Sequence, residues 1–332
     1  MNFDLNLILF PLAFISGIVC FLSGVYVMLR SFFGFRAQIN RSVNMDLEII
    51  RVTKIIKSKE ELAQGEKEGW KEEIGAMEQL LVSLGSIKHK AGILKKIFYG
   101  IPQIVLEIAN PANSEEIFFY MSFPKKYRGN IEKQIQSFFP NASLEKVTDY
   151  TIFHPGNITA SAILKLKHKH FLPLRTYETM DVDPLNGISN SLSKLDDKKE
   201  GAAIQLVVIP AGKNWKAKGR LVAHEMQQGK RLSDVHSHSI VNTVGKGLGK
   251  GIEEIIKTTT KKEGEDSMKE KAPIQLTPEE QELIKSIENK ANKIGFKVNL
   301  RLVASAQTQE RAEEILSQLE NSFSQFENSD VN

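Results

Sequence analysis

Cysteine, net charge and catalytic motifs are all scarce in this sequence of 332 residues. Its single cysteine, Cys20, excludes an intrachain disulfide and a CxxC-type zinc or redox site. The 44 basic and 40 acidic side chains leave a net charge of only +4, which does not indicate a nucleic-acid-binding protein. The sequence has no nucleophile elbow, no H-E-x-x-H motif and no acid pair singled out by its spacing. We therefore expect no catalytic, cofactor-binding or metal site.

What the sequence does contain is a long apolar run at its N-terminus. From Leu7 to Leu29 it holds 23 residues without a charge, enough as a helix to cross a hydrocarbon core of about 30 Å. A cleaved signal peptide is the alternative. However, residues 1–6 contain no Lys or Arg, and no A-x-A-like site follows the run. We predict an uncleaved transmembrane anchor with its juxtamembrane segment at residues 1–41.

Three arginines follow the apolar run and predict its orientation. Arg30, Arg36 and Arg41 have no acid among them, whereas Asp4 is the only charge on the N-terminal side. The positive-inside rule then places the bulk of the chain in the cytoplasm and the N-terminus outside, as a single-pass protein of the cell (inner) membrane.

Two further features concern contact with membrane or partner helices. Ser16, Cys20 and Gly24 recur at every fourth position, a small-residue stripe that lets two helices approach closely; an ordinary lipid-facing helix is an equal alternative. A second feature is a group of lysines among apolar residues, with no acid from position 86 to 106. Such a segment suits an anionic lipid surface, although a solvated loop explains it as well. These lysines are Lys88, Lys90, Lys95 and Lys96.

Residues 45–150 show the periodicities of a β-α-β-β-α-β unit. Strand patterns cover 46–54, 103–109, 116–123 and 144–147, and the middle two predict a hairpin. Helical patterns cover 67–84 and the stretch after Pro124. This order predicts a ferredoxin-like domain.

A second copy of the order begins at residue 157. Strands are expected at 158–167, 202–209 and 296–305, and helices after Asp183-Pro184, at 215–228, after the capping box at Thr277, and at 308–326. The fold class expected is therefore α+β, with a transmembrane helix and two ferredoxin-like domains. The second domain comprises 157–229 and 273–332, lacks its closing strand, and is interrupted by a long insertion at 230–272 that we read as a flexible linker. We expect that the chain continues in nature or that another chain supplies the strand.

Two motifs resemble a phosphate-binding loop and a zinc site, but their sequences differ from those that such sites require. The glycines of GKGLGKG (245–251) resemble a phosphate-binding loop, but Lys246 and Lys250 are each followed by glycine rather than Ser or Thr. The histidine pairs 168/170 and 236/238 lack the neighbouring Cys or carboxylate cluster of a zinc site, and solvated loops explain both.

Longer stretches carry a family resemblance. EEIFFYMSFPKKYRGNIEKQIQSFFPNASLEKVTDYT, LPLRTYETMDVDPLNGISNSLSKL and GFKVNLRLVASAQTQERAEEILSQLENSFSQF resemble the region before the motor domain of bacterial type IV secretion and conjugation ATPases, which are coupling-protein-like. The resemblance runs from about Leu47 to the C-terminus. It implies a membrane anchor and an assembly region that precede a motor moving DNA or protein.

Our leading hypothesis is thus a non-catalytic, membrane-tethered region that positions such a motor, in cis or in trans, and that forms a homo-oligomer. The alternative is a stand-alone membrane-anchored scaffold or binding protein without a motor. Direct nucleic-acid binding is not predicted, because the basic-aromatic sheet pattern needed for base stacking is missing.

Overall fold

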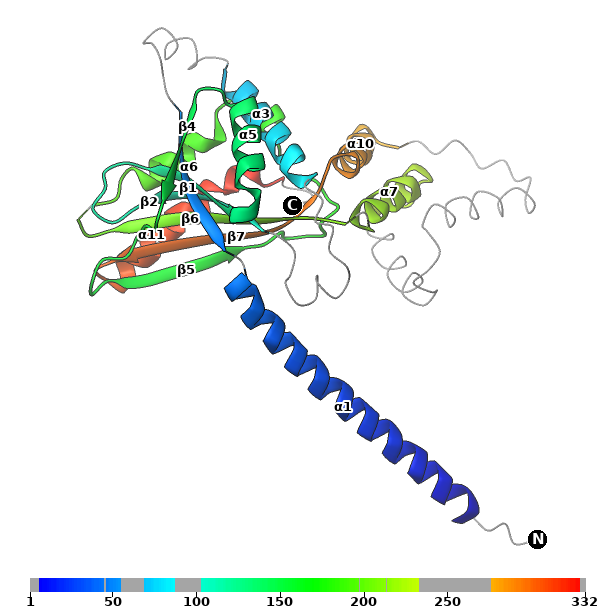
Figure 1. Cartoon of the computed structure of the whole chain (residues 1–332). Helices are drawn as coiled ribbons and strands as arrows, with labels where there is room; N and C mark the ends of the chain where they lie inside the picture. The colour runs from blue at the N-terminus through cyan, green and yellow to red at the C-terminus, as the bar shows by residue number, and fades with distance from the viewer. Residues whose placement is uncertain are drawn as a thin grey trace.

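The computed structural model describes residues 6–44, 46–54, 69–86, 103–196, 198–212, 214–232 and 276–328, and the side chains of 14–35 in the first range. Helix α1 (Asn6–Asn44) projects away from the rest of the protein as a long rod (Figure 1). One residue, Met45, separates its end from the segment that leads into the first strand. Helix α1 therefore continues beyond Leu29, the end of the apolar run, and its C-terminal end is joined almost directly to the folded part.

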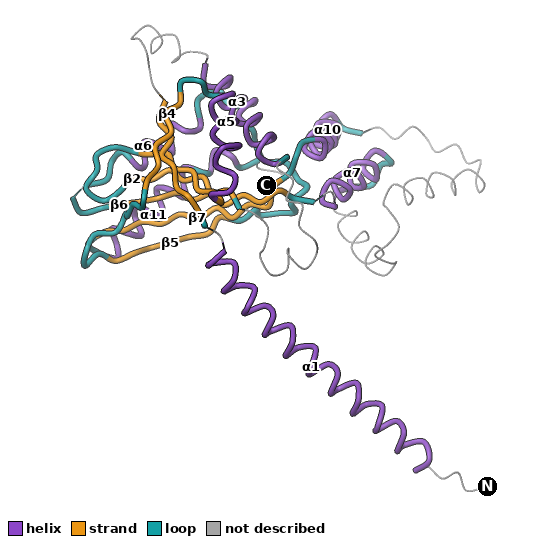
Figure 2. The backbone as a smooth tube through the Cα atoms, viewed as in Figure 1, coloured by secondary structure: helices purple, strands orange, loops and turns teal. Residues whose placement is uncertain are grey.

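The folded part is built on one antiparallel sheet of seven strands (Figure 2). Its order is β4-β1-β3-β2-β6-β7-β5, and every pairing between these strands is antiparallel. The mixed α+β class expected from the sequence is confirmed. The strands are β1 (Leu47–Lys54), β2 (Ile104–Asn110), β3 (Phe118–Pro124), β4 (Ala142–Val147), β5 (Ile158–Leu164), β6 (Gly201–Pro210) and β7 (Phe296–Ala306).

Helices begin where the sequence supplies caps. The Asp183 side chain accepts a bond from the Leu185 amide at the start of α6 (Pro184–Leu192). Thr277 and Glu280 form the predicted capping box of α10 (Pro278–Asn292). The remaining helices are α3 (Gly69–Gly85), α5 (Arg128–Phe138), α7 (Asn214–Gln227) and α11 (Gln309–Ser322), with 3₁₀ turns η1 (Lys125–Tyr127), η2 (Tyr177–Thr179) and η3 (Ser324–Phe326).

The first half of the sheet, β4-β1-β3-β2, packs its core against α3 and α5. Phe123 of β3, Leu84 of α3 and Ile131 of α5 are almost completely buried in this core. Each such side chain contributes about 1.5–3 kcal/mol through burial. The predicted β2–β3 hairpin is confirmed by its pairing from Val105↔Ser122 to Ala109↔Phe118.

The second half, β6-β7-β5, packs against α6 and α11. Leu192 of α6, Leu302 of β7 and Leu319 of α11 are fully buried together. Strand β5 ends at Leu164, three residues before the predicted end, and α11 ends at Ser322 with η3 completing the predicted helical stretch. Strand β5 lies at the edge of the sheet, with β7 as its partner on one side.

Strands β2 and β6 join the two halves into one continuous sheet. They pair over seven positions, from Ile104↔Val208 to Asn110↔Ala202. Ile204 lies in the core under α11 and Val208 in the core under α5, and residues of equal parity on a strand share one face. All four of these helices therefore cover the same face of the sheet.

The opposite face is crossed by the segment between β4 and β5, residues 148–157, which we call the strap. Ile152 of the strap is buried against Ala109 and Tyr120, with Ala203 and Val303 nearby. These residues come from four adjacent strands, so the strap covers part of the face opposite the four helices.

Helices α7 and α10 lie between β6 and β7 in the sequence. They pack on each other and on Phe171 and Leu172, around a small core of their own. They lie beside one end of the sheet (Figure 1). Nearly all of the predicted linker, residues 233–272, lies outside the described residues, as do the glycine run at 245–251 and His236 and His238.

Candidate functional site

The most prominent feature that the sequence predicted is the anchor, and α1 has the properties it requires. Residues Phe14–Phe35 form 22 residues of mean hydropathy 1.8, none of them buried within the protein. Such a helix is long and apolar enough to span a membrane. Leu29 is half exposed and Arg30 directly follows it, whereas the side chains of Leu7, Arg36 and Arg41 lie outside the described ones.

The small-residue stripe lies on the exposed surface of this helix. A Cβ placed on Gly24 would meet no atom within 4 Å, so packing within the chain does not require a glycine there. Ser16 and Cys20 are likewise exposed, and the Cys20 carbonyl accepts a bond from the Ser23 hydroxyl at 2.8 Å. The stripe is therefore accessible to a second helix, and its role stays a prediction.

The other sequence features yield no assembled site. The lipid-surface lysines Lys88, Lys90, Lys95 and Lys96 lie outside the described residues. Burial lowers the pKa of His170, and the positive charges of Lys218, Lys290 and Lys169 lower it further. The positive charges of these lysines disfavour the binding of a metal cation at His170. No group of three or more potential His, Cys, Asp or Glu ligands occurs in the part of the chain that the structure describes.

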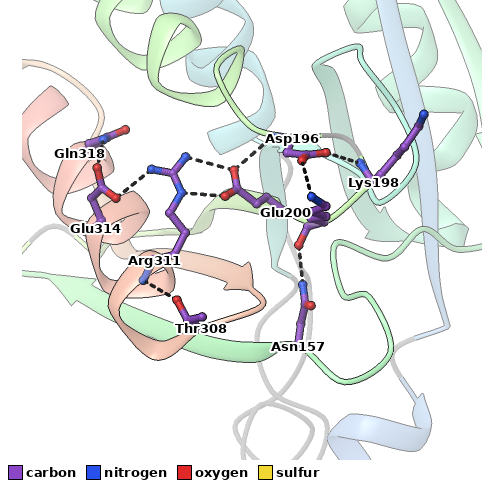
Figure 3. Close-up of polar contacts among 9 residues, drawn as sticks. Asn157, Asp196, Lys198, Glu200, Thr308, Arg311, Glu314 and Gln318 are labelled. Carbon is purple, nitrogen blue, oxygen red and sulfur yellow. Dashed lines mark hydrogen bonds and ion pairs between the residues drawn. The ribbon is translucent and has the colours of Figure 1, made fainter.

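A polar network that the sequence did not reveal ties the start of β6 to α11 (Figure 3). Arg311 holds the buried Glu200 with two bonds, from Nε to Oε1 at 2.6 Å and from Nη2 to Oε2 at 3.1 Å. Its Nη1 also donates to Glu314 at 2.8 Å. The backbone amide of Asp196 donates to Glu200 Oε2 at 3.0 Å.

These contacts set the protonation state of the buried carboxylate. Burial alone raises the pKa of Glu200, but the hydrogen bonds from Arg311 and from the Asp196 amide, with the charge of Arg311, outweigh it and lower the pKa below its usual value. Both carboxylates around Arg311 are occupied in ion pairs. The network is thus a structural clamp rather than a pair of carboxylates available for acid–base chemistry.

The same end of the sheet is tied to β5. Asn157, just before β5, donates from Nδ2 to the Lys199 carbonyl at 2.8 Å and to Ser305 Oγ at 3.3 Å. Thr308 accepts a bond from the Arg311 amide and so caps α11. Figure 3 shows the bonds of Arg311 to Glu200 and Glu314 and, beside them, the bond from Asn157 to the backbone just before Glu200. Asn157 therefore ties the start of edge strand β5 to the segment before β6 and to β7.

A second buried carboxylate lies under the strap. Tyr150 stacks on Tyr120 with ring centroids 4.1 Å apart, and its hydroxyl donates to Glu107 at 2.6 Å. Gln205 donates to the other oxygen of Glu107 and accepts a bond from Arg301. Burial, followed by the bond and charge of Glu107, raises the pKa of Tyr150, so this hydroxyl stays protonated. Here too the acid is committed to structure.

The fold and these contacts define a mixed α+β protein that carries a membrane-length apolar helix in front of an antiparallel sheet. Residues 64–332 match the family described as "Domain of unknown function (DUF8128)", and the chain belongs to that family. None of the curated proteins matches this chain.

Proposed function

We propose that this protein is a non-catalytic, membrane-tethered assembly region of a type IV secretion or conjugation ATPase system. The observation that carries the proposal is the exposed apolar helix α1, joined almost directly to strand β1. A folded sheet connected by so short a link to a membrane-length helix suits a positioning role. The resemblance of the sequence to the region before such motors supplies the context.

We further propose that each half of the sheet is a ferredoxin-like unit. The chain order of the first half is β-α-β-β-α-β, and its spatial order is β4-β1-β3-β2. In the second half β5, β7 and β6 take the places of β1, β3 and β2. Helices α7 and α10 then belong to an insertion in the hairpin between β6 and β7.

In this proposal the sheet lies on the cytoplasmic side of the inner membrane, several copies associate, and a motor acts in cis or in trans. Arg30, Arg36 and Arg41 support the orientation by the positive-inside rule. The paired state of Glu107 and Glu200 agrees with a region that binds and positions rather than catalyses.

The gene beyond the codon for Asn332 tests the proposal. An in-frame strand followed by G-x-x-x-x-G-K-[ST] would support a motor in cis. A stop codon, with no motor gene beside it, would favour the stand-alone scaffold instead.

Purified in detergent, residues 1–332 should neither bind nor hydrolyse ATP. The expected result is turnover no higher than that of the Lys246→Ala/Lys250→Ala variant. Turnover of the wild-type chain clearly above background would contradict the non-catalytic proposal, and its persistence in the variant would place the site elsewhere than the glycine run.

A further inference from the structure

The outer edge of β5 differs from the other edge of the same sheet. Strand β4, at the opposite end, carries Glu145 and Lys146, charges of the kind that protect sheet edges. Strand β5 has the sequence ITASAIL, without a charge or a proline. Ile158 and Ile163 are 41% and 57% exposed. Among the described strands only β7 pairs with β5, so the other row of backbone amides and carbonyls is open to a further strand.

Helix α11 lies over the part of the sheet next to this open edge. Ala312, Ile315 and Leu319 face the sheet. One flank of α11 is turned toward β6 and α6, because Arg311 binds Glu200 and Gln325, just beyond the helix, donates to the Pro184 carbonyl.

The helical period then places Gln309, Glu313, Leu316 and Glu320 on the opposite flank, above the outer side of β5. Glu313 and Glu320 are exposed, and Leu316 is partly buried between them.

In the first half of the protein, a strand pairs with the edge that corresponds to the open edge of β5. There β4 pairs with β1 in antiparallel fashion, from Ile49↔Val147 to Lys54↔Ala142. On the face covered by helices, Leu144 packs into the core and Lys146 Nζ lies 3.4 Å from Glu48 Oε1. An edge strand with apolar and basic residues on its helix-facing side thus completes that half.

We propose that the edge of β5 binds an extended segment of a partner protein with the sequence pattern basic-x-apolar-x-basic. The two basic side chains and the apolar side chain of this segment face α11. Glu313 and Glu320 are seven residues apart, about 10 Å along the helix axis. The two basic residues, four positions apart on a strand, are separated by about 13 Å. Lysine or arginine can bridge this small difference, and the apolar residue between them covers Leu316. Strand β5 is seven residues long, which limits the bound segment to about the same length.

A second copy of β5 fits the same edge less well. Antiparallel pairing of two β5 strands brings the α11 helices of both copies together across the twofold axis. Glu313 and Glu320 of each copy would then face like charges, which disfavours the pair. The inference goes beyond the proposed tethering role and does not depend on it.

The test uses the full chain in detergent micelles and a labelled peptide, acetyl-TKTVTKT-amide. Its valine and both lysines share one face of a strand. Two control peptides are TETVTET, with the charge reversed, and KTTVTTK, with the same composition but the lysines on the other face. The first peptide should bind and slow amide hydrogen exchange in residues 158–164. Each control should bind at least about threefold more weakly.

Matched variants of α11 locate the binding site. Glu313→Lys and Glu320→Lys should each weaken binding of acetyl-TKTVTKT-amide about three- to tenfold. Glu310→Lys makes the same charge change on the solvent side of the same helix and should leave binding within about twofold.

Four results would overturn the proposal. They are no binding, equal binding of all three peptides, equal effects of Glu310→Lys and Glu313→Lys, and protection elsewhere than in β5. Protection without peptide of those β5 amides that point away from β7 would also contradict it. If that protection rises with protein concentration, a second copy occupies the edge; if it does not, the chain covers its own edge.

Discussion

Glu107 and Glu200 are single residues that tie together segments far apart in the sequence. Each is buried, and each holds partners about a hundred positions away, such as Gln205 for Glu107 and Arg311 for Glu200. Neither residue was predicted from the sequence. A glutamate inside the apolar strand IVLEIAN was the available signal for Glu107, but its partners depend on strand pairing that periodicity does not reveal.

The Glu200 clamp predicts a pH-dependent stability. Its pKa is lowered in the folded state, so the contribution is fully present above the unfolded pKa of about 4.5 and is lost as the pH falls through the lower folded value. We expect Glu200→Gln to reduce the free energy of unfolding by about 1–3 kcal/mol at pH 7, with the difference from wild type shrinking below about pH 4.5.

Urea unfolding followed by tryptophan fluorescence measures this difference. Glu314→Gln is the control, because Glu314 contacts the same Arg311 but is 56% exposed, and it should cost at most about 0.5 kcal/mol. A difference for Glu200→Gln that stays constant between pH 7 and 3 would contradict the clamp.

The strap approaches the backbone at position 201 so closely that only glycine fits there. A Cβ at this position would lie 2.2 Å from the Ile152 carbonyl oxygen. We expect Gly201→Ala to displace the strap and to lower the free energy of unfolding by about 1–3 kcal/mol. Gly129→Ala in α5, where a Cβ meets no atom within 4 Å, should be neutral or stabilising by up to about 1 kcal/mol. Equal effects of the two substitutions would refute the strap contact.

At the scale of elements, the sequence was informative because periodicity and caps act locally. The caps at Asp183 and Thr277 are both found. What it could not supply was the junction of the two halves. Strand β2 lies at the edge of the first half and strand β6 at the edge of the second. Hydrophobic alternation along a strand specifies which face of the sheet a side chain takes, but not which strand lies beside it. The sequence predicted two ferredoxin-like domains but not the β2–β6 pairing, which joins all seven strands in one sheet.

Helix α1 allows a test of the small-residue stripe. If Ser16, Cys20 and Gly24 form a helix-packing face, Gly24→Ile should weaken association of the full chain in detergent, by about 1 kcal/mol. Gly17→Ile is the matched control, since a Cβ at Gly17 also meets no atom within 4 Å but lies off the stripe. Sedimentation equilibrium measures both. Equal association of the two variants and wild type would favour an ordinary lipid-facing helix.

At the scale of the whole molecule, we propose a folded sheet tethered to a bilayer by one helix. The sheet is continuous over seven strands, and four helices cover one of its faces. Only the helix α1 offers a long, entirely exposed apolar surface among the described residues. The orientation of that helix decides which compartment contains the open edge of β5 and any motor.

Cysteine labelling in intact cells tests this claim most directly. Cys20→Ser gives a cysteine-free chain, into which Asn2→Cys or Ser324→Cys is introduced. A membrane-impermeant maleimide should label the cysteine at position 2 in intact cells, and the exposed position 324 only after lysis. Labelling of position 324 in intact cells, or release of the unmodified protein from membranes by alkaline carbonate, would contradict the account.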